Sequence, residues 1–460
     1  MRTPTHMWGR EYYSDTWKSG MDFWLVQMPG LYLSPGSLEF ADILATAQVF
    51  ATMQTLFVIL AVAFAYYYIV LPMNYVKDLS AVGYDHLLKG SGLSLAQRKG
   101  RTKRQLVQEV RRLRKVGNLP PVYPNGWFSL LESRELAPGE VKHVPALGEN
   151  FAVFRTLAGI VHILDAYCPH LGANMGVGGL VRGDCLECPF HLWSFRGEDG
   201  KCTSIPYSDK VPDFARVKKW PSCEENNIVF VWYHAENEEP TWLPTAIPQI
   251  QNGDVWYRGR NEFLVNSHIQ DIPENAGDVA HLNALHAPSM LAGSDLRFVR
   301  RLLYSFARHV WNAKWQPSAE AHHQATMHLH HEFHLFNRIP LIVMDIHVKQ
   351  IGPGYVELYM STSLGTMTLL QTVTPVEPLL QKLVHRLYCP PFLSPFANFI
   401  LYGESIMVER DIMVWNHKTY IDKPILVKED QSIRRHRHWF NQFYSENSPR
   451  FSFQQENTDW

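Results

Sequence analysis

One long, uncharged and largely apolar run stands out from the rest of the chain, at residues 43–72. It ends near three consecutive tyrosines, Tyr66 to Tyr68. About twenty apolar residues are enough for a helix to cross the hydrocarbon core of a bilayer, and tyrosine favours the bilayer interface. The run starts too far from the first residue to be a signal peptide, which would open the chain with a basic segment. We therefore predict one transmembrane helix over residues 43–72.

The pattern changes at the proline-rich segment 120–126. Prolines end helices and favour extended chain, so this segment marks a domain boundary. Short β-like runs between turns follow at 141–144, 151–155, 160–164 and 228–232. Their length and spacing predict an all-β module over residues 120–238, followed by a proline-containing linker at 239–248.

Alternating apolar and polar residues return in 249–460, most clearly in 340–376, and predict an antiparallel sheet. Residues 378–401 are apolar but broken by prolines, and are too interrupted to span a bilayer. We predict a core helix there, with a membrane-facing entry for a lipid as the alternative. The chain is therefore expected to have an α+β fold, with one membrane helix, an all-β module and a second, sheet-rich domain.

Basic residues are distributed unevenly around the apolar run, because three precede it and eleven follow within 73–118. Positive charge favours the cytosolic side of a membrane, so we predict that residues 1–42 are lumenal and that the chain after the span is cytosolic. Residues 73–119 are predicted as a basic juxtamembrane linker, with a helix in 95–116 that lies on anionic headgroups or in solvent. The net charge of −1 argues against nucleic-acid binding.

Two Cys–His pairs suggest the first metal centre. Cys168 and His170 form a Cys-x-His pair, and Cys188 and His191 form a Cys-x-x-His pair further along the chain. A Rieske [2Fe-2S] cluster needs two thiolates on one iron and two imidazoles on the other. The alternative is a zinc site that uses Cys185, but it gives no reason for His191 to follow Cys188 at this spacing.

A second group of possible ligands follows the linker. His281 and His286 are five residues apart, on a helix or at its frayed end, where both imidazoles can reach one metal. One added carboxylate would complete the two-His-one-carboxylate triad of a non-haem iron(II) oxygenase. Candidates for this third ligand lie far along the chain, at Glu404, Glu409 and Asp411.

A run of histidines between His322 and His334 also looks like a metal site. It nearly matches the zinc-protease motif and one histidine box of the membrane desaturases. That second class needs several boxes and several spans, and the sequence shows one span and no second box. Because 326–336 alternates in β fashion, we predict strand histidines, some of them lining a pocket.

Over residues 120–420 the chain resembles the Rieske-type non-haem iron oxygenases, because it carries both motifs in this order. The resemblance implies a Rieske [2Fe-2S] domain and a helix-grip catalytic domain that holds a mononuclear Fe(II). It places the carboxylate ligand shortly before a hydrophobic–Trp pair on a C-terminal helix, which is the position of Asp411 before Trp415. Glu404 and Glu409 are then expected to be solvated or ion-paired.

The resemblance also assigns Asp278. In the family, subunits pack head to tail in a ring, and an aspartate bridges a cluster histidine of one subunit to an iron ligand of the next. By position Asp278 is expected to join His191 of a neighbouring subunit to His281. A heterologous interface that closes gives such a ring, and a homotrimer is expected.

The segment Pro-Pro-Val-Tyr-Pro-Asn-Gly-Trp at 120–127, the single preceding span and the chain length are similar to the Neverland group of animal cholesterol 7-desaturases. This resemblance implies a single-pass protein of the endoplasmic reticulum that converts cholesterol to 7-dehydrocholesterol with O2 and electrons from NAD(P)H. No dinucleotide-binding fingerprint is present in the sequence, so a separate ferredoxin- or flavin-type reductase is expected to supply the electrons. The alternatives are a Rieske hydroxylase of another steroid or lipid, a non-catalytic Rieske electron carrier and a zinc-built lipid-binding protein.

Overall fold

The computed structural model describes residues 40–84, 87, 100–295 and 306–451. Two compact units divide the chain, residues 1–65 and residues 66–460. Helix α1 (Phe40–Ile69) is, within the described ranges, the one helix long and apolar enough to cross a membrane, with a mean hydropathy of 2.0 over Leu44–Ile69. It matches the span predicted at 43–72. Most of the segment predicted to be lumenal, 1–42, lies outside the described residues.

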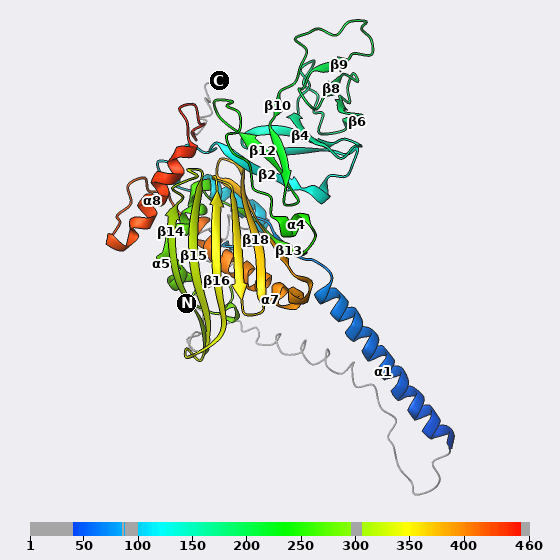
Figure 1. Ribbon diagram of the computed structural model, residues 1–460, viewed down its shortest axis with the longest axis vertical. Helices are drawn as coiled ribbons and strands as arrows, with labels where there is room; N and C mark the ends of the chain where they lie inside the picture. Colours follow the sequence, from blue (N-terminus) through cyan, green and yellow to red (C-terminus); the bar gives the residue numbers. More distant parts are fainter. Residues whose placement is uncertain (1–39, 85–86, 88–99, 296–305, 452–460) are drawn as a thin grey trace, which may run out of the picture. The chain divides into compact units, whose positions relative to one another are not determined.

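An eight-stranded sheet forms the centre of the second unit, in the order β1-β13-β19-β18-β17-β16-β15-β14 (Figure 1). All neighbouring pairs are antiparallel except β1 with β13, which is parallel. The strands are β1 (Met73–Lys77), β13 (Trp256–Val265), β14 (Ala307–Pro317), β15 (Gln324–Leu335), β16 (Ile339–Ile351), β17 (Tyr355–Thr362), β18 (Gly365–Glu377) and β19 (Leu380–Cys389).

Helices cover one face of this sheet and leave a cavity between sheet and helix. The long helix α7 (Ser394–Trp415) packs against β13 and β19, and the short helix α5 (Val279–Leu285) packs against β14. A third helix, α8 (Gln431–Phe440), also contacts β14. Sheet-facing positions recur on α7 every three to four residues, as helical geometry requires. The predicted sheet-and-helix catalytic domain is confirmed.

Three small antiparallel sheets make up the Rieske module. One is β10-β5-β4-β3, the second is β11-β12-β2, and the third is the β6-β7-β8-β9 meander. Their strands are β2 (Gly126–Glu132), β3 (Val141–Ala146), β4 (Glu149–Arg155), β5 (Val161–Asp165), β6 (Leu180–Arg182), β7 (Cys185–Glu187), β8 (Ser194–Arg196), β9 (Cys202–Ser204), β10 (Lys219–Trp220), β11 (Ser222–Glu225) and β12 (Ile228–Tyr233). Each strand-like run predicted from the sequence coincides with one of these strands, except that the run at 160–164 begins one residue before β5.

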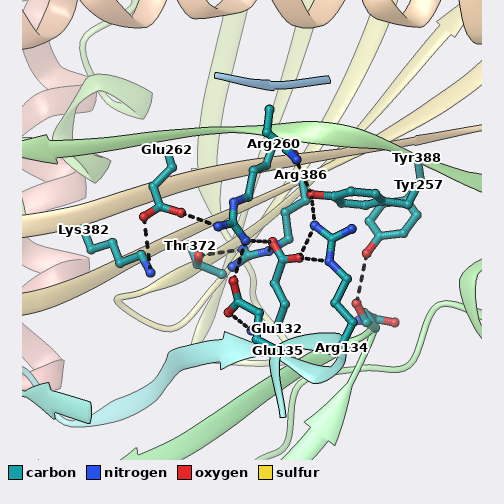
Figure 2. Close-up of polar contacts among 12 residues, drawn as sticks. Glu132, Arg134, Glu135, Tyr257, Arg260, Glu262, Thr372, Lys382, Arg386 and Tyr388 are labelled. Carbon is teal, nitrogen blue, oxygen red and sulfur yellow. Dashed lines mark hydrogen bonds and ion pairs between the residues drawn. The ribbon is translucent and has the colours of Figure 1, made fainter. Parts of the chain in front are cut away.

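Strand β2 joins the Rieske module to the catalytic sheet through a buried ionic network (Figure 2). Glu132, at the end of β2, accepts hydrogen bonds from Arg386 of β19 at 3.0 Å and from Arg134 at 2.8 Å, and it pairs with Arg260 of β13 at 2.8 Å. Arg386 also donates to Thr372 of β18 at 2.9 Å. Charges from both modules therefore satisfy one another at the junction.

The segment predicted as a basic linker, 73–119, is part of the folded unit instead. Its first residues form β1, an edge strand of the catalytic sheet. Its helix α3 (Lys103–Arg112) buries Leu106 and Val107 in a core cluster with Leu380. Leu113, which directly follows the helix, is exposed, and the start of the helix predicted at 95–116 lies outside the described residues. The helix was predicted to lie on headgroups or in solvent, but its apolar side packs on the protein instead.

The prediction of a core helix at 378–401 is corrected as well. Residues 380–389 form strand β19, and only the part from Ser394 onward is helical, as the start of α7. Two prolines, Pro390 and Pro391, separate the strand from the helix. Proline supplies no backbone N–H to a strand and restricts the residue before it to extended chain, so the apolar run is divided between two elements.

Candidate metal centres

Two matching loops present the four residues of the first motif. Cys168 N donates to Ala173 O, and Cys168 O accepts from the amide four residues on, at 2.9 Å in both cases. The loop that begins at Cys188 repeats this pattern with Trp193 and Leu192, at 2.8 and 3.0 Å. In both loops the fourth residue after the cysteine has a positive φ, 74° at Gly172 and 59° at Leu192. The repeated geometry gives the two loops the same backbone path.

The side chains on these loops separate into a sulfur pair and an imidazole pair. Both thiols, of Cys168 and Cys188, are buried, and burial raises the pKa of the Cys168 thiol to about 11, with the nearby Cys188 thiol acting in the same direction. The rings of His170 and His191 are half-buried, and their centroids are 4.7 Å apart. This arrangement fits the donor set of a Rieske cluster, with two sulfurs for one iron and two nitrogens for the other.

The alternative zinc site would combine Cys185 with Cys168, His170 and Cys188, and the surroundings of Cys185 do not favour it. This residue begins β7, and its sulfur lies 3.5 Å from the hydroxyl of Thr203 on the neighbouring hairpin. Among the described residues, one group of three side chains has ligand atoms close enough together to bind a single ion, and Cys185 does not belong to it. Of the three remaining cysteines, Cys202 and Cys389 are buried and Cys223 is half-buried.

The three residues predicted as the second metal centre form the group that could bind a single ion. One ligand atom each of His281, His286 and Asp411 lie within 4.8 Å of one another. His281 is on α5, His286 is the residue that ends it, and Asp411 comes from α7. Nε2 of His286 is 3.2 Å from Oδ1 of Asp411. The structure therefore brings together residues that are 125 positions apart in the sequence.

The tautomer of His281 suits a metal ligand. Its Nδ1 donates to the backbone carbonyl of Asp278, so Nε2 presents a lone pair toward the other two side chains. Asn275 donates to Oδ1 of Asp411 at 3.2 Å and lies 3.5 Å from Nε2 of His281. Two imidazoles and one carboxylate, held by hydrogen bonds from outside the triad, are the donor set of a mononuclear non-haem iron(II).

Arg410 fixes the two helices that carry these ligands relative to each other. The side chain is fully buried on α7 and donates to the carbonyls of Pro288 at 2.7 Å, Ser289 at 2.9 Å and Gly293 at 3.0 Å. These carbonyls belong to the segment directly after His286. Burial lowers the pKa of Arg410 to about 10, which leaves the guanidinium charged at neutral pH.

The other two carboxylates considered as third ligands are paired with other side chains, although Glu404 lines the same cavity as Asp411. Glu409 forms an ion pair with Lys77 of β1, and Glu404 pairs with His385 of β19. Both lie on α7, but a helix places residues two positions apart on different faces, so Glu409 cannot share the face of Asp411.

A largely apolar cavity of about 320 Å³ opens beside the triad. Its wall is built from alternate residues of the sheet, such as Met327, Leu329, Val348 and Leu358, and from one stripe of α7. His309 and His331 also line it, with their ring nitrogens 2.7 Å apart. Burial lowers the pKa of His309 to about 3 and that of His331 to about 4, so both are neutral at pH 7.

Two family models match the chain, and they match its two modules separately. Residues 126–219 match the Rieske [2Fe-2S] domain, and residues 231–444 match the 3-ketosteroid 9α-hydroxylase C-terminal domain. A cholesterol 7-desaturase of Xenopus laevis is 50% identical over 395 residues, which cover 85% of this chain and 84% of that relative. The chain belongs to the cholesterol 7-desaturase family.

More distant relatives agree with this placement. The cholesterol 7-desaturase of Drosophila melanogaster is 44% identical over 400 residues, 85% of this chain and 92% of that relative. Among solved structures, dicamba monooxygenase bound to dicamba has the same fold, with a TM-score of 0.54 at 14% identity over 70% of this chain and 98% of that one. Members of the cholesterol 7-desaturase family are Rieske oxygenases, so the family resemblance drawn from the two motifs is confirmed.

From His328 to His334, the histidine run of this cholesterol 7-desaturase family member lies on β15, whose two faces differ. His331 faces the cavity, whereas His328 lines a separate surface hollow together with His330. His330 hydrogen-bonds to Asp345 at 2.7 Å and contacts Glu332 at 3.2 Å. Within the described part of the chain these histidines form no group that could hold a metal.

Sequence reasoning missed several residues around the triad. Asn275 is inside the second motif but carried no signal of its own, and Arg410 is next to Asp411 in the sequence. A buried arginine beside a predicted ligand on a helix is a usable signal, because a buried charge needs partners. His309 on β14 and Gln350 on β16, which both line the cavity, gave no local signal.

Proposed function

We propose that this chain is a membrane-anchored Rieske oxygenase that desaturates cholesterol to 7-dehydrocholesterol. The reaction removes two hydrogens from the sterol and, with O2, two electrons and two protons, forms two molecules of water. The observation that carries the proposal is the triad of His281, His286 and Asp411, which opens on an apolar cavity downstream of a Rieske motif, in a chain that is 50% identical to a cholesterol 7-desaturase.

The proposed ligands are Cys168, His170, Cys188 and His191 for a [2Fe-2S] cluster, and His281, His286 and Asp411 for a mononuclear iron. When bound, the cluster supplies single electrons and the iron supplies the chemistry of dioxygen. The chain's own residues do the positioning. Asn275 orients the Asp411 carboxylate, Arg410 holds α5 against α7, and the apolar wall excludes water from the reacting part of the sterol.

A second copy of the chain is proposed to complete the electron path. Asp278 caps the N-terminus of α5, where its side chain accepts from His281 N at 3.3 Å and remains half-exposed. A half-exposed carboxylate at this place suits a hydrogen bond to His191 of a neighbouring subunit, whose ring is also half-exposed. A closed ring of three subunits would repeat this contact three times.

The electrons are proposed to come from NAD(P)H through a separate ferredoxin- or flavin-type reductase. A relative in Rhodococcus rhodochrous, 29% identical over 72% of this chain, is named as the oxygenase component of a probable 3-ketosteroid-9-alpha-monooxygenase. The excess of basic residues after the span supports a cytosolic catalytic unit, and the endoplasmic reticulum is the proposed location.

The test is turnover by the full chain in membranes with a reductase, NADPH, cholesterol and O2, with sterol products identified by mass spectrometry. We expect 7-dehydrocholesterol and, for the variant Asp278→Asn, a rate lower by about 100-fold. Asparagine caps helices as well as aspartate does, so this variant should keep the fold, the mononuclear iron and the cluster spectrum. A hydroxylated sterol as the main product would refute desaturation. Normal turnover by Asp278→Asn would refute the bridge.

A further inference from the structure

Large apolar side chains are exposed together at one end of the catalytic sheet. Because neighbouring strands are antiparallel, this end contains the start of β14, the β15–β16 turn, the β17–β18 turn and the end of β19. In Figure 1 the β15–β16 turn lies at the end of the sheet away from the Rieske strands. We call the exposed residues at this end the apolar edge: Phe306, Phe336, Ile339, Leu341, Leu364 and Phe392.

The exposure of this edge is high for residues of this kind. Leu341 is 61% exposed, Leu364 60% and Phe392 72%. Contiguous exposed apolar groups mark an interaction surface more often than scattered ones do. The edge extends across the tips of several strands, and neighbouring strands are about 4.8 Å apart. A single cationic residue, Arg338, is exposed between Phe336 and Ile339 at the β15–β16 turn.

The chain also leaves the predicted span at this end. Leu71 comes two residues before β1, whose first residue pairs with Gly259 near the start of β13. Arg258 is fully buried and donates to the carbonyls of Val70 and Leu71, both at 3.1 Å, and to Asn398 of α7 at 3.1 Å. The residues that follow the span are therefore fixed to the sheet end that carries the apolar edge.

We infer that the apolar edge lies in the interfacial region of the same bilayer that α1 crosses. Burial of leucine and phenylalanine side chains in that region is favourable, and Arg338 can extend its guanidinium to the headgroups. Arg258 attaches the residues that follow the span to the sheet, and this attachment keeps the apolar edge at the membrane surface for any substrate. Phe399, on the first turns of α7 at this end, both lines the cavity and is 42% exposed.

Fluorescence quenching of the full chain in phosphatidylcholine vesicles tests this surface. Single cysteines at the edge, Leu341→Cys and Leu364→Cys, are labelled with bimane and exposed to nitroxide-labelled lipid or to aqueous iodide. The control is Ile425→Cys, which is 100% exposed and follows the far end of α7. Helix α7 has 22 residues, so its two ends are about 33 Å apart. The unsubstituted chain corrects for labelling of native cysteines.

We expect the lipid nitroxide to quench the two edge probes at least about twofold more than the control probe, and iodide to show the reverse order. Equal quenching of all three probes by iodide would overturn the inference. Protection of the edge probes from both quenchers, lost on dilution of the protein in the vesicles, would also overturn it, because a second copy of the chain would then cover the edge.

A separate observation concerns the polar residues of the cavity wall. Gln350, Gln371 and His385 lie in one cross-strand row on β16, β18 and β19, with Val356 of β17 between the first two. All four line the cavity. Gln350 is only 3% exposed, and among the described residues neither its amide nitrogen nor its amide oxygen has a hydrogen-bond partner. An unsatisfied buried amide in a largely apolar wall is costly unless a ligand satisfies it.

The geometry points to Gln350 as the group that binds the hydroxyl of the substrate, an inference that rests on the proposed function. A sterol has one hydroxyl, which both donates and accepts, and a primary amide offers one group for each role. Binding the hydroxyl at this row would orient the ring system along the cavity and thereby select the carbons that face the triad. Gln350 is thus a positioning residue and not a catalytic one.

Equilibrium binding to the oxidised holoenzyme without reductant tests this role, with cholesterol and its 3-deoxy analogue as probes. We expect wild type to prefer cholesterol by about 10-fold or more, and Gln350→Met, which keeps the side-chain length, to bind the two sterols equally. Equal binding by wild type would overturn the role of Gln350 and leave the proposed function standing. If neither sterol binds, both proposals fail.

Discussion

Replacing Asp411 with alanine is expected to remove the mononuclear iron and to lower sterol turnover by more than about 100-fold, because loss of a direct ligand exceeds the usual effect of losing a supporting hydrogen bond. The carboxylate is 8% exposed and lies against His286, so no other group can take its place without moving a helix. The measurement combines iron and sulfide counts with product analysis. The cluster absorbance should stay unchanged, because its ligands lie in a different module.

Glu409→Gln is the matched control for this experiment. It changes a carboxylate on the same helix, two residues away, that pairs with Lys77 and not with the histidines. The variant should retain both metals and full turnover, with a stability loss of at most about 1 kcal/mol, since Lys77 is partly exposed. If Glu409→Gln lost the mononuclear iron while Asp411→Ala kept it, the assignment of the third ligand would be reversed.

Asp411 and Glu409 show how much of the metal site could be predicted from the sequence. His281 and His286 could be paired from the sequence because they are five residues apart, on a helix and at its end, where both imidazoles can reach one metal. Asp411 lies 125 residues after His286, and local spacing left it equivalent to Glu404 and Glu409. Only the resemblance to a family singled it out before the structure placed it beside the histidines.

The cavity residues that the sequence did not predict are brought together by the pairing of strands in the sheet. Gln350, Gln371 and His385 form one row because four strands pair in a particular register, and no local pattern encodes that register. The same reason applies to β1, whose five residues become a strand only because β13 offers a free edge. Alternation along a single strand, by contrast, is a local property, and it correctly indicated that the histidines of β15 divide between two faces.

Replacing Glu132 with glutamine is expected to destabilise the folded unit by about 3–5 kcal/mol, because it leaves buried guanidinium groups without a carboxylate. Glu132 is 3% exposed and contacts Arg386, which is also 3% exposed, together with Arg134 and Arg260 (Figure 2). The midpoint of thermal unfolding of the full chain measures the effect. Glu140→Gln is the control, since Glu140 and its partner Lys142 are both largely exposed at 3.4 Å, and its cost should stay below about 1 kcal/mol.

The pH dependence of stability distinguishes the ionic contribution of Glu132 from its packing contribution. Burial acts to raise the pKa of Glu132, but the guanidinium groups of Arg386 and Arg260 outweigh it, so its pKa is lower than that of an unfolded glutamate. A lowered pKa in the folded state adds stability at neutral pH that is lost as the pH falls through the acid range. The difference between wild type and Glu132→Gln should therefore be largest near pH 7 and shrink on acidification. A difference that stayed constant with pH would mean that packing, and not the ionic network, joins the Rieske module to the catalytic sheet.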